Sequence, residues 1–132
     1  MILANRNIPE WVMQGIGKHH EGMFGIGEIR EGQLIAGIAF ENKKAKSIWG
    51  HQKIEAPPSK AFWITAADYI FNHCKCERMS ATVEADNAKA IRLNLHIGFV
   101  IEHVLKDAGD NGDLLIMTLW KDNCRFLKWV KK

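Results

Sequence analysis

Three side chains of this 132-residue chain are the candidates for a general base: His51, Glu41 and Glu84. His51 is the first candidate, because an imidazole changes its charge near neutral pH and can take a proton from an ammonium group. Glu41 is the second candidate and Glu84 the third. The competing interpretation of each is a structural or solvent-exposed polar group.

A cluster at 73–76, His-Cys-Lys-Cys, carries residue types that suit zinc. Its Cys-x-Cys spacing is poor for a metal site, and no second Cys/His pair follows at the distance found in zinc fingers. We therefore predict a helix end with partly buried thiols, and no metal.

The composition indicates a globular protein and predicts a single domain over 1–132. A formal net charge of +3 would suit an anionic cofactor or substrate, but it is not the dense basic stripe of a dedicated nucleic-acid binder. The chain has three cysteines, shows no signal-peptide pattern and has no apolar run long enough to span a membrane. We expect a cytoplasmic protein without membrane contact.

The first half of the chain predicts a helix followed by a strand meander. Pro9, apolar residues at helical spacing and a closing glycine predict a short helix over 8–17. Three strands follow, and connections this short imply antiparallel pairing. The expected strands and turns are 25–30, 33–41 and 46–55, joined at Glu31-Gly32 and at Asn42-Lys43-Lys44. Alternation along the third strand places His51 and Lys53 on the face opposite to Gly50 and Gln52.

The second half predicts two helices interleaved with strands. Pro57 and Pro58 end the third strand, and Ser59 is a potential N-cap for the next helix. The expected elements are a helix at 60–74, a strand at 78–85, a helix at 86–97, and a hairpin of 99–108 and 112–120. This order predicts an α/β (α+β) fold with a mixed, mostly antiparallel central sheet and helices on both faces.

The segment NAKAIRLNLHIGF at 87–99 carries the pattern N-x-x-A-I-x-L-x-x-x-I-G-F between two predicted strands. With this order of elements, the chain resembles the GNAT superfamily of acyl-CoA-dependent N-acyltransferases over roughly residues 24 to 120. It is similar above all to small GNAT-like proteins of phages and prophages, through LIAGIAFEN, CERMSATVEADNAKAIRLNLHIGF, GDLLIMTLW and CRFL.

The resemblance implies where an acyl-CoA co-substrate would bind. The strand 46–55 would splay from the strand 78–85, and the pantetheine arm would add to the exposed edge. The pyrophosphate would lie on the N-terminus of the following helix. Asn87 would contact the pantetheine arm or tie the splayed strand, or it is a plain N-cap, and Gly50 is a candidate for a bulge. The implied cofactor-binding residues are Lys53, Ile54, Glu55, Ser59, Lys60, Ala61, Phe62, Asn87 and Ala90.

Two positions depart from the family pattern. The pyrophosphate loop, usually Gln/Arg-x-x-Gly-x-Gly/Ala, is here EAPPSKAF, without its glycines and with two prolines that lack an N–H. Lys60 and the amides from Ser59 onward could compensate. Many members also have a tyrosine, as general acid, where this chain has Asn94, which can donate a hydrogen bond but no proton. We keep Asn94 as a catalytic candidate by position, and expect the one tyrosine, Tyr69, in the core.

The leading hypothesis is an N-acyltransferase that moves an acetyl or similar group from acyl-CoA to a primary amine by direct attack, without a metal. The resemblance places His19 and His20 in the loop that builds the acceptor pocket, although exposed loop residues are the alternative. One competing hypothesis is a catalytically inactive GNAT-shaped phage or prophage module with a binding or structural role. Another is a protein that modifies nucleic acid, with Trp49 or Trp120 as stacking residues. The acceptor is unassigned, and exposed sheet edges are compatible with a homodimer.

Overall fold

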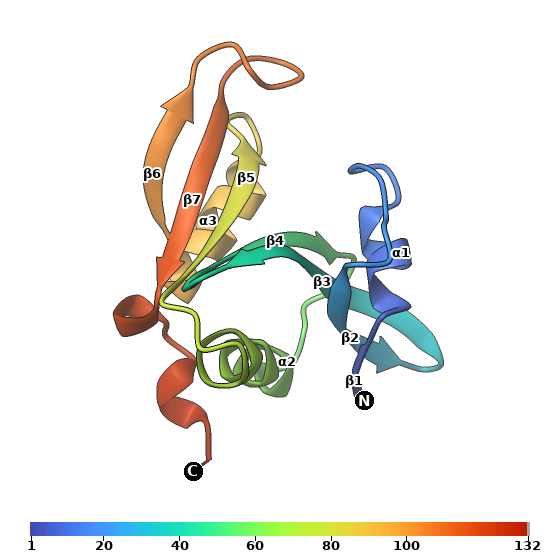
Figure 1. Ribbon diagram of the computed structural model, residues 1–132. Coiled ribbons are helices and arrows are strands. Elements are labelled where there is room, and N and C mark those ends of the chain that lie inside the picture. The colour runs from blue at the N-terminus through green and yellow to red at the C-terminus, as the bar shows by residue number, and fades with distance from the viewer. Residues whose placement is uncertain (132) are drawn as a thin grey trace.

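The computed structural model describes residues 1–131 and centres on one seven-stranded sheet (Figure 1). The strand order is β1-β2-β3-β4-β5-β7-β6, and only the β4–β5 pair is parallel. The strands are β1 (Ile2–Asn5), β2 (Phe24–Arg30), β3 (Gln33–Lys44), β4 (Ser47–Ile54), β5 (Arg78–Glu84), β6 (Val100–Leu105) and β7 (Leu114–Trp120). The predicted mixed, mostly antiparallel α/β architecture is confirmed.

Helices cover both faces of the sheet. The short helix α1 (Ile8–Met13) packs so closely on β3 that a Cβ at Gly37 would lie 2.7 Å from Val12 Cγ2. On the other face lie α2 (Lys60–Ala67), which continues into a π-helical turn over Asp68–His73, and α3 (Ala88–Ile97). Short 3-10 turns at Lys121–Asn123 and Leu127–Trp129 follow the last strand. Within residues 1–131, no helix has the length and apolar character needed to cross a membrane.

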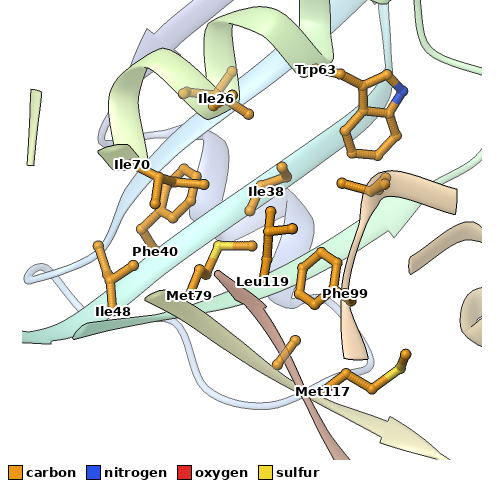
Figure 2. Close-up of a cluster of buried hydrophobic side chains, with 14 of the residues drawn as sticks. Ile26, Ile38, Phe40, Ile48, Trp63, Ile70, Met79, Phe99, Met117 and Leu119 are labelled. Carbon is orange, nitrogen blue, oxygen red and sulfur yellow. The ribbon is translucent and has the colours of Figure 1, made fainter. Parts of the chain in front are cut away.

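The main core lies between the sheet and the pair α2 and α3 (Figure 2). The alternation of β3 decides which side chains enter it: Ile38 and Phe40 are buried here, whereas Ala39 joins the smaller cluster under α1. Trp63 from α2 and Phe99 after α3 complete the packing. Both faces of the β3–β4 region are thus fixed by packing, so the strand that follows β3 is held in one orientation.

The sheet opens between β4 and β5. These strands pair over three residues each, Ser47–Trp49 with Arg78–Ser80, and then diverge, as Figure 1 shows. From Gly50 to Ile54, β4 is paired only with β3, while β5 stays paired with β7 along its whole length. The splayed strand pair expected from the resemblance is therefore present.

Gly50 lies where the strands separate, but the predicted bulge there is wrong. The β3–β4 register runs without interruption through Gly50 and Phe40, and the irregularity lies between Glu41 and Lys44. A Cβ at Gly50 would lie 2.8 Å from Met79 Sδ. The glycine therefore leaves room for the side chain of Met79 directly after the last β4–β5 pair.

Several predicted boundaries are also wrong. The predicted helix 8–17 ends at Met13, and Gly15 adopts a positive φ of 78° just beyond it. The predicted turn at 42–44 belongs to β3, which continues to Lys44, so the connection falls at Ala45, with a φ of 53°. The edge strand β1 was not predicted, and β6 and β7 span 100–105 and 114–120, so the loop between them is longer than expected.

Candidate active site

Glu41 is the centre of a hydrogen-bonded group of three side chains. Its Oε1 lies 2.9 Å from Nε2 of His20, and its Oε2 is hydrogen-bonded to Nε2 of His51. Glu41 faces Trp49 in the β3–β4 register, and His51 follows two residues later on the same face, under α1. His20 reaches the group from the loop between α1 and β2. The structure thus brings together the first two candidate bases and one histidine of the predicted acceptor loop.

The hydrogen bonds determine which nitrogen of each neutral histidine carries the proton. Nδ1 of His20 accepts from the amide of Gly22 at 3.1 Å, so Nε2 must be the donor to Glu41. His51 likewise donates through Nε2, because the Glu41 carboxylate can only accept. Its Nδ1 then holds a free lone pair, and no residue within 1–131 hydrogen-bonds to it. His51 is arranged to accept a proton at Nδ1.

The environment of Glu41 keeps its carboxyl group ionised. Burial alone would raise the pKa of Glu41, but the hydrogen bonds from His20 and His51 outweigh it and lower that pKa below its usual value. The side chain is only 15% exposed, so solvent screens it weakly. A carboxylate held here stabilises a positive charge on His51 once that imidazole has taken up a proton.

His51 faces the opening between β4 and β5. A cleft of about 340 Å³ lies there, walled by Gly50–Gln52, by Ala81–Glu84 and by parts of α3 and the loop after α1. Glu84, the third candidate base, lines the same cleft, but its Oε1 accepts from the amide of Asp110 at 2.7 Å. Glu84 therefore ties β5 to the β6–β7 loop, and His51 is left as the base with an available nitrogen.

Asn94 also lines this cleft and is nearly inaccessible, with 2% of its surface exposed. Its Nδ2 lies 3.7 Å from Met117 Sδ, and its Oδ1 has no hydrogen-bond partner within residues 1–131. A buried carbonyl oxygen without a partner costs stability unless something binds to it. The position that the resemblance assigns to a proton donor is thus occupied by an amide with unused hydrogen-bonding capacity.

A second cleft, of about 490 Å³, lies beyond the end of β4. Four of the predicted cofactor-binding residues line it: Ile54, Glu55, Asn87 and Ala90. Asn87 is the N-cap of α3, and its Oδ1 accepts from the amide of Ala90 at 3.1 Å. The same residue therefore caps the helix and lines the cleft. The two clefts share Gln52, Asn87 and Ala90 in their walls and therefore meet at the opening.

The other predicted cofactor-binding residues do not line this cleft. Lys53 points to the face of α1, where its Nζ lies 3.3 Å from Trp11 O. The amide of Phe62 donates to Ser59 Oγ at 3.3 Å, and the amide of Ser59 donates to Glu28 Oε1 at 2.8 Å. Lys60 and Ala61 are exposed, and the Lys60 ammonium lies over the ring of Trp129.

Glu28 is the residue of this region that the sequence analysis missed. Its side chain is 7% exposed and contacts Arg30 as well as Ser59. The available signal was its position: Ile26 and Glu28 alternate on the buried face of β2, where a charge requires a partner. No cluster of three or more His, Cys, Asp or Glu side chains within 1–131 is arranged to hold a metal ion.

Neither a protein-family model nor a curated protein sequence matches the chain, but solved structures do. A chimera of the Vibrio cholerae spermidine N-acetyltransferase SpeG and hSSAT matches with a TM-score of 0.69 and 16% identity, over 96% of this chain and 98% of that chain. A mutant of SpeG from V. cholerae, named as a spermidine/spermine N-acetyltransferase, matches at 0.66 and 20%, over 84% and 70%. YncA of Salmonella typhimurium, assigned as an acetyltransferase and solved with acetyl-CoA, matches at 0.60 and 19%, over 79% and 68%. At such identities the likeness is one of fold, and the chain has the GNAT fold of these acetyltransferases.

Proposed function

We propose that this protein is an N-acyltransferase, which moves an acetyl or similar acyl group from acyl-CoA to a primary amine. The observation that carries the proposal is the opening between β4 and β5 with His51 in its wall, a histidine whose Nδ1 has no partner within residues 1–131. An unpaired strand edge offers main-chain donors and acceptors to an extended ligand. The pantetheine arm of acyl-CoA is such a ligand, because it is narrow and contains amide groups.

Different residues of the two clefts would bind different parts of the acyl-pantetheine arm. Main-chain groups of 50–54 would hold the arm, with Ile54, Asn87 and Ala90 around it. The carbonyl oxygen of Asn94, which has no partner within residues 1–131, would accept a further hydrogen bond in the smaller cleft. The bound thioester would supply an activated acyl carbonyl, and the walls of the cleft would direct it toward His51.

The amine then attacks the acyl carbon directly. A C–N bond forms, the C–S bond breaks, and the proton released by the amine passes to Nδ1 of His51. Glu41 stabilises the imidazolium that results, and His20 fixes Glu41 in place. Asn94 has no proton to give, so the sulfur leaves as a thiolate and takes its proton from water.

The acceptor that fits the cleft is a cationic amine of the polyamine type. Glu84 and Asp110 line the cleft near His51, and no Lys or Arg within residues 1–131 does so. Carboxylates would hold a second ammonium group of the acceptor while the first reacts. Two of the solved neighbours are named for spermidine acetylation, which supports the same class of acceptor.

The test is the release of free thiol from acetyl-CoA with spermidine as acceptor, with the acetylated amine identified by mass spectrometry. We expect equal amounts of thiol and acetylated amine. Glu84→Gln should raise KM for spermidine about tenfold and leave KM for a monoamine unchanged. An absence of product with every amine at millimolar acetyl-CoA would instead favour a GNAT-shaped binding module without catalysis.

A further inference from the structure

Most backbone N–H groups around the start of α2 are missing or already hydrogen-bonded within the protein. Between residues 55 and 62, Pro57 and Pro58 have no N–H, and the amides of Glu55 and Ala56 donate to Ile35 O at 2.8 and 3.2 Å. The remaining donors are largely engaged as well, since Ser59 N binds Glu28 and Phe62 N binds Ser59. Within the described chain, only the amides of Lys60 and Ala61 in this run lack a partner.

A negative charge already lies beside the N-cap of this helix. Glu28 Oε1 lies 2.8 Å from the amide of Ser59, where a helix N-terminus would otherwise attract a phosphate. Burial alone would raise the pKa of Glu28, but the hydrogen bonds from Ser59 and Arg30 outweigh it and lower the pKa, so the group is a carboxylate at neutral pH. Arg30 also donates to Pro57 O at 3.2 Å, which fastens the loop in this position.

The basic side chains nearby do not replace the missing donors. The Lys60 ammonium lies 3.4 Å from the ring centroid of Trp129. Lys89 is the one cation in the wall of the larger cleft among residues 1–131, and the carboxylate of Glu55 lines the same wall. A diphosphate carries two adjacent negative groups and is bound by several amides or guanidinium groups at once. At the described start of α2, only the two amides of Lys60 and Ala61 are free for such binding.

The part of the cleft that suits the pantetheine arm is intact. The β4 edge is unpaired from Gly50 to Ile54, and the cleft beside it measures about 490 Å³. We infer that the protein recognises its donor through the acylated pantetheine arm and places no diphosphate at the start of α2. The donor class is then any acyl-pantetheine thioester, with or without the nucleotide. This inference rests on the proposed acyl transfer and deepens it.

Calorimetric titration of the full chain with acetyl-CoA and with S-acetylpantetheine tests the inference. We expect dissociation constants that agree within about tenfold. Acetyl-CoA binding more than about tenfold tighter would overturn the inference and leave the proposed function standing. If neither thioester binds at millimolar concentration, the proposed function fails and the inference fails with it.

Glu28→Gln provides a second test, because it removes the charge and keeps an oxygen for Ser59. We expect acetyl-CoA to bind about threefold or more tightly, and S-acetylpantetheine to bind as before. The matched control is Glu31→Gln, which removes an exposed charge from the adjacent turn and should change neither constant. An equal change for both thioesters, or no change for either, would count against the inference. If Glu28→Gln does not fold, the inference is decided by the binding of the two thioesters to the wild-type protein.

Discussion

Glu28 and Glu41 lie on neighbouring strands and on opposite faces of the sheet, and both are largely buried carboxylates with lowered pKa values. Their partners differ. Glu41 is bound by two imidazoles, a type of side chain that can both accept and donate a proton. Glu28 is bound by a backbone amide and a guanidinium, which cannot.

This difference separates a site that can perform proton transfer from one that fastens a loop. A buried carboxylate with a lowered pKa is present in both regions, so the pKa direction alone does not identify the reactive one. The titratable partner and the open cleft beside it make that distinction. Changes at the Glu41 group should therefore alter catalysis, and changes at Glu28 should alter stability and donor preference.

The largest effect is expected from His51→Gln. Removing a general base typically lowers the rate by about 10² to 10⁴, so kcat with acetyl-CoA and spermidine should fall by that factor. Donor affinity measured by calorimetry should stay unchanged, because the donor is proposed to bind to main-chain groups of 50–54 and not to this side chain. His96→Gln, on an exposed position of α3, is the control. A His51→Gln variant with wild-type kcat would remove His51 from the mechanism.

Glu41→Gln should have the next largest effect. The glutamine oxygen can accept from one histidine, but its NH2 group cannot accept from the other, and the side chain carries no charge to stabilise the imidazolium. We expect kcat to fall by about tenfold to a hundredfold, as for other residues that orient a reactive side chain. The amine concentration needed for half-saturation should change little, which a full kinetic titration will show. A change in KM alone would mean that Glu41 belongs to acceptor binding.

Glu28→Ala tests the proposed role of Glu28, which is to fasten the loop before α2. It leaves the amide of Ser59 without its acceptor, and an unsatisfied buried donor costs about 1 to 3 kcal/mol. Urea denaturation should show that loss in the free energy of unfolding, while kcat with S-acetylpantetheine stays at the wild-type value. A loss of kcat without a loss of stability would show that Glu28 acts in catalysis.

Asn94→Leu should separate binding from folding in the smaller cleft. Leucine fills a similar volume and removes the unsatisfied Oδ1 together with the weak contact of Nδ2 to Met117 Sδ, so the free protein should gain about 1 kcal/mol of stability. Binding of acetyl-CoA should weaken at the same time, because the ligand loses a hydrogen bond. Thermal unfolding with and without acetyl-CoA measures both effects. A destabilised variant would show that the amide has a partner in the folded protein.

The smallest effect is the pH dependence that the two glutamates share. Their pKa values lie below the usual 4.5 in the folded state, so each contributes stability above that pH and loses it as the pH falls through the lowered value. The melting temperature should therefore fall as the pH is lowered below about 4.5. In the Glu28→Gln/Glu41→Gln double variant this fall should be shallower, and an unchanged slope would contradict the assigned partners.

The sequence was sufficient to predict the parts of the fold that depend on periodicity. Alternation along β4 correctly placed His51 and Lys53 opposite Gly50, and the Asn87 to Phe99 pattern correctly predicted a capped helix that ends at a glycine. The opening beside Gly50 followed from the resemblance and is confirmed by the end of the β4–β5 pairing.

Contacts between distant segments could not be predicted in this way. The approach of His20 to Glu41 depends on the path of the loop after α1, and that of Glu28 to Ser59 joins residues 31 positions apart. Neither contact leaves a local pattern in the sequence. The early end of α1 and the extension of β3 to Lys44 both involve residues with positive φ. Two of these residues, Asn42 and Ala45, are of types that do not require a positive φ, so the sequence does not predict it.

A crystal structure with acetyl-CoA would show where the donor binds. We expect the pantetheine arm along the β4 edge from Gly50 to Ile54 that is not paired with β5, with the acyl group on the side of His51. The diphosphate should lie away from the amide of Ser59, which should still be bound to Glu28. A ligand bound outside the opening, or strands β4 and β5 paired along their full length, would refute the proposed mode of binding.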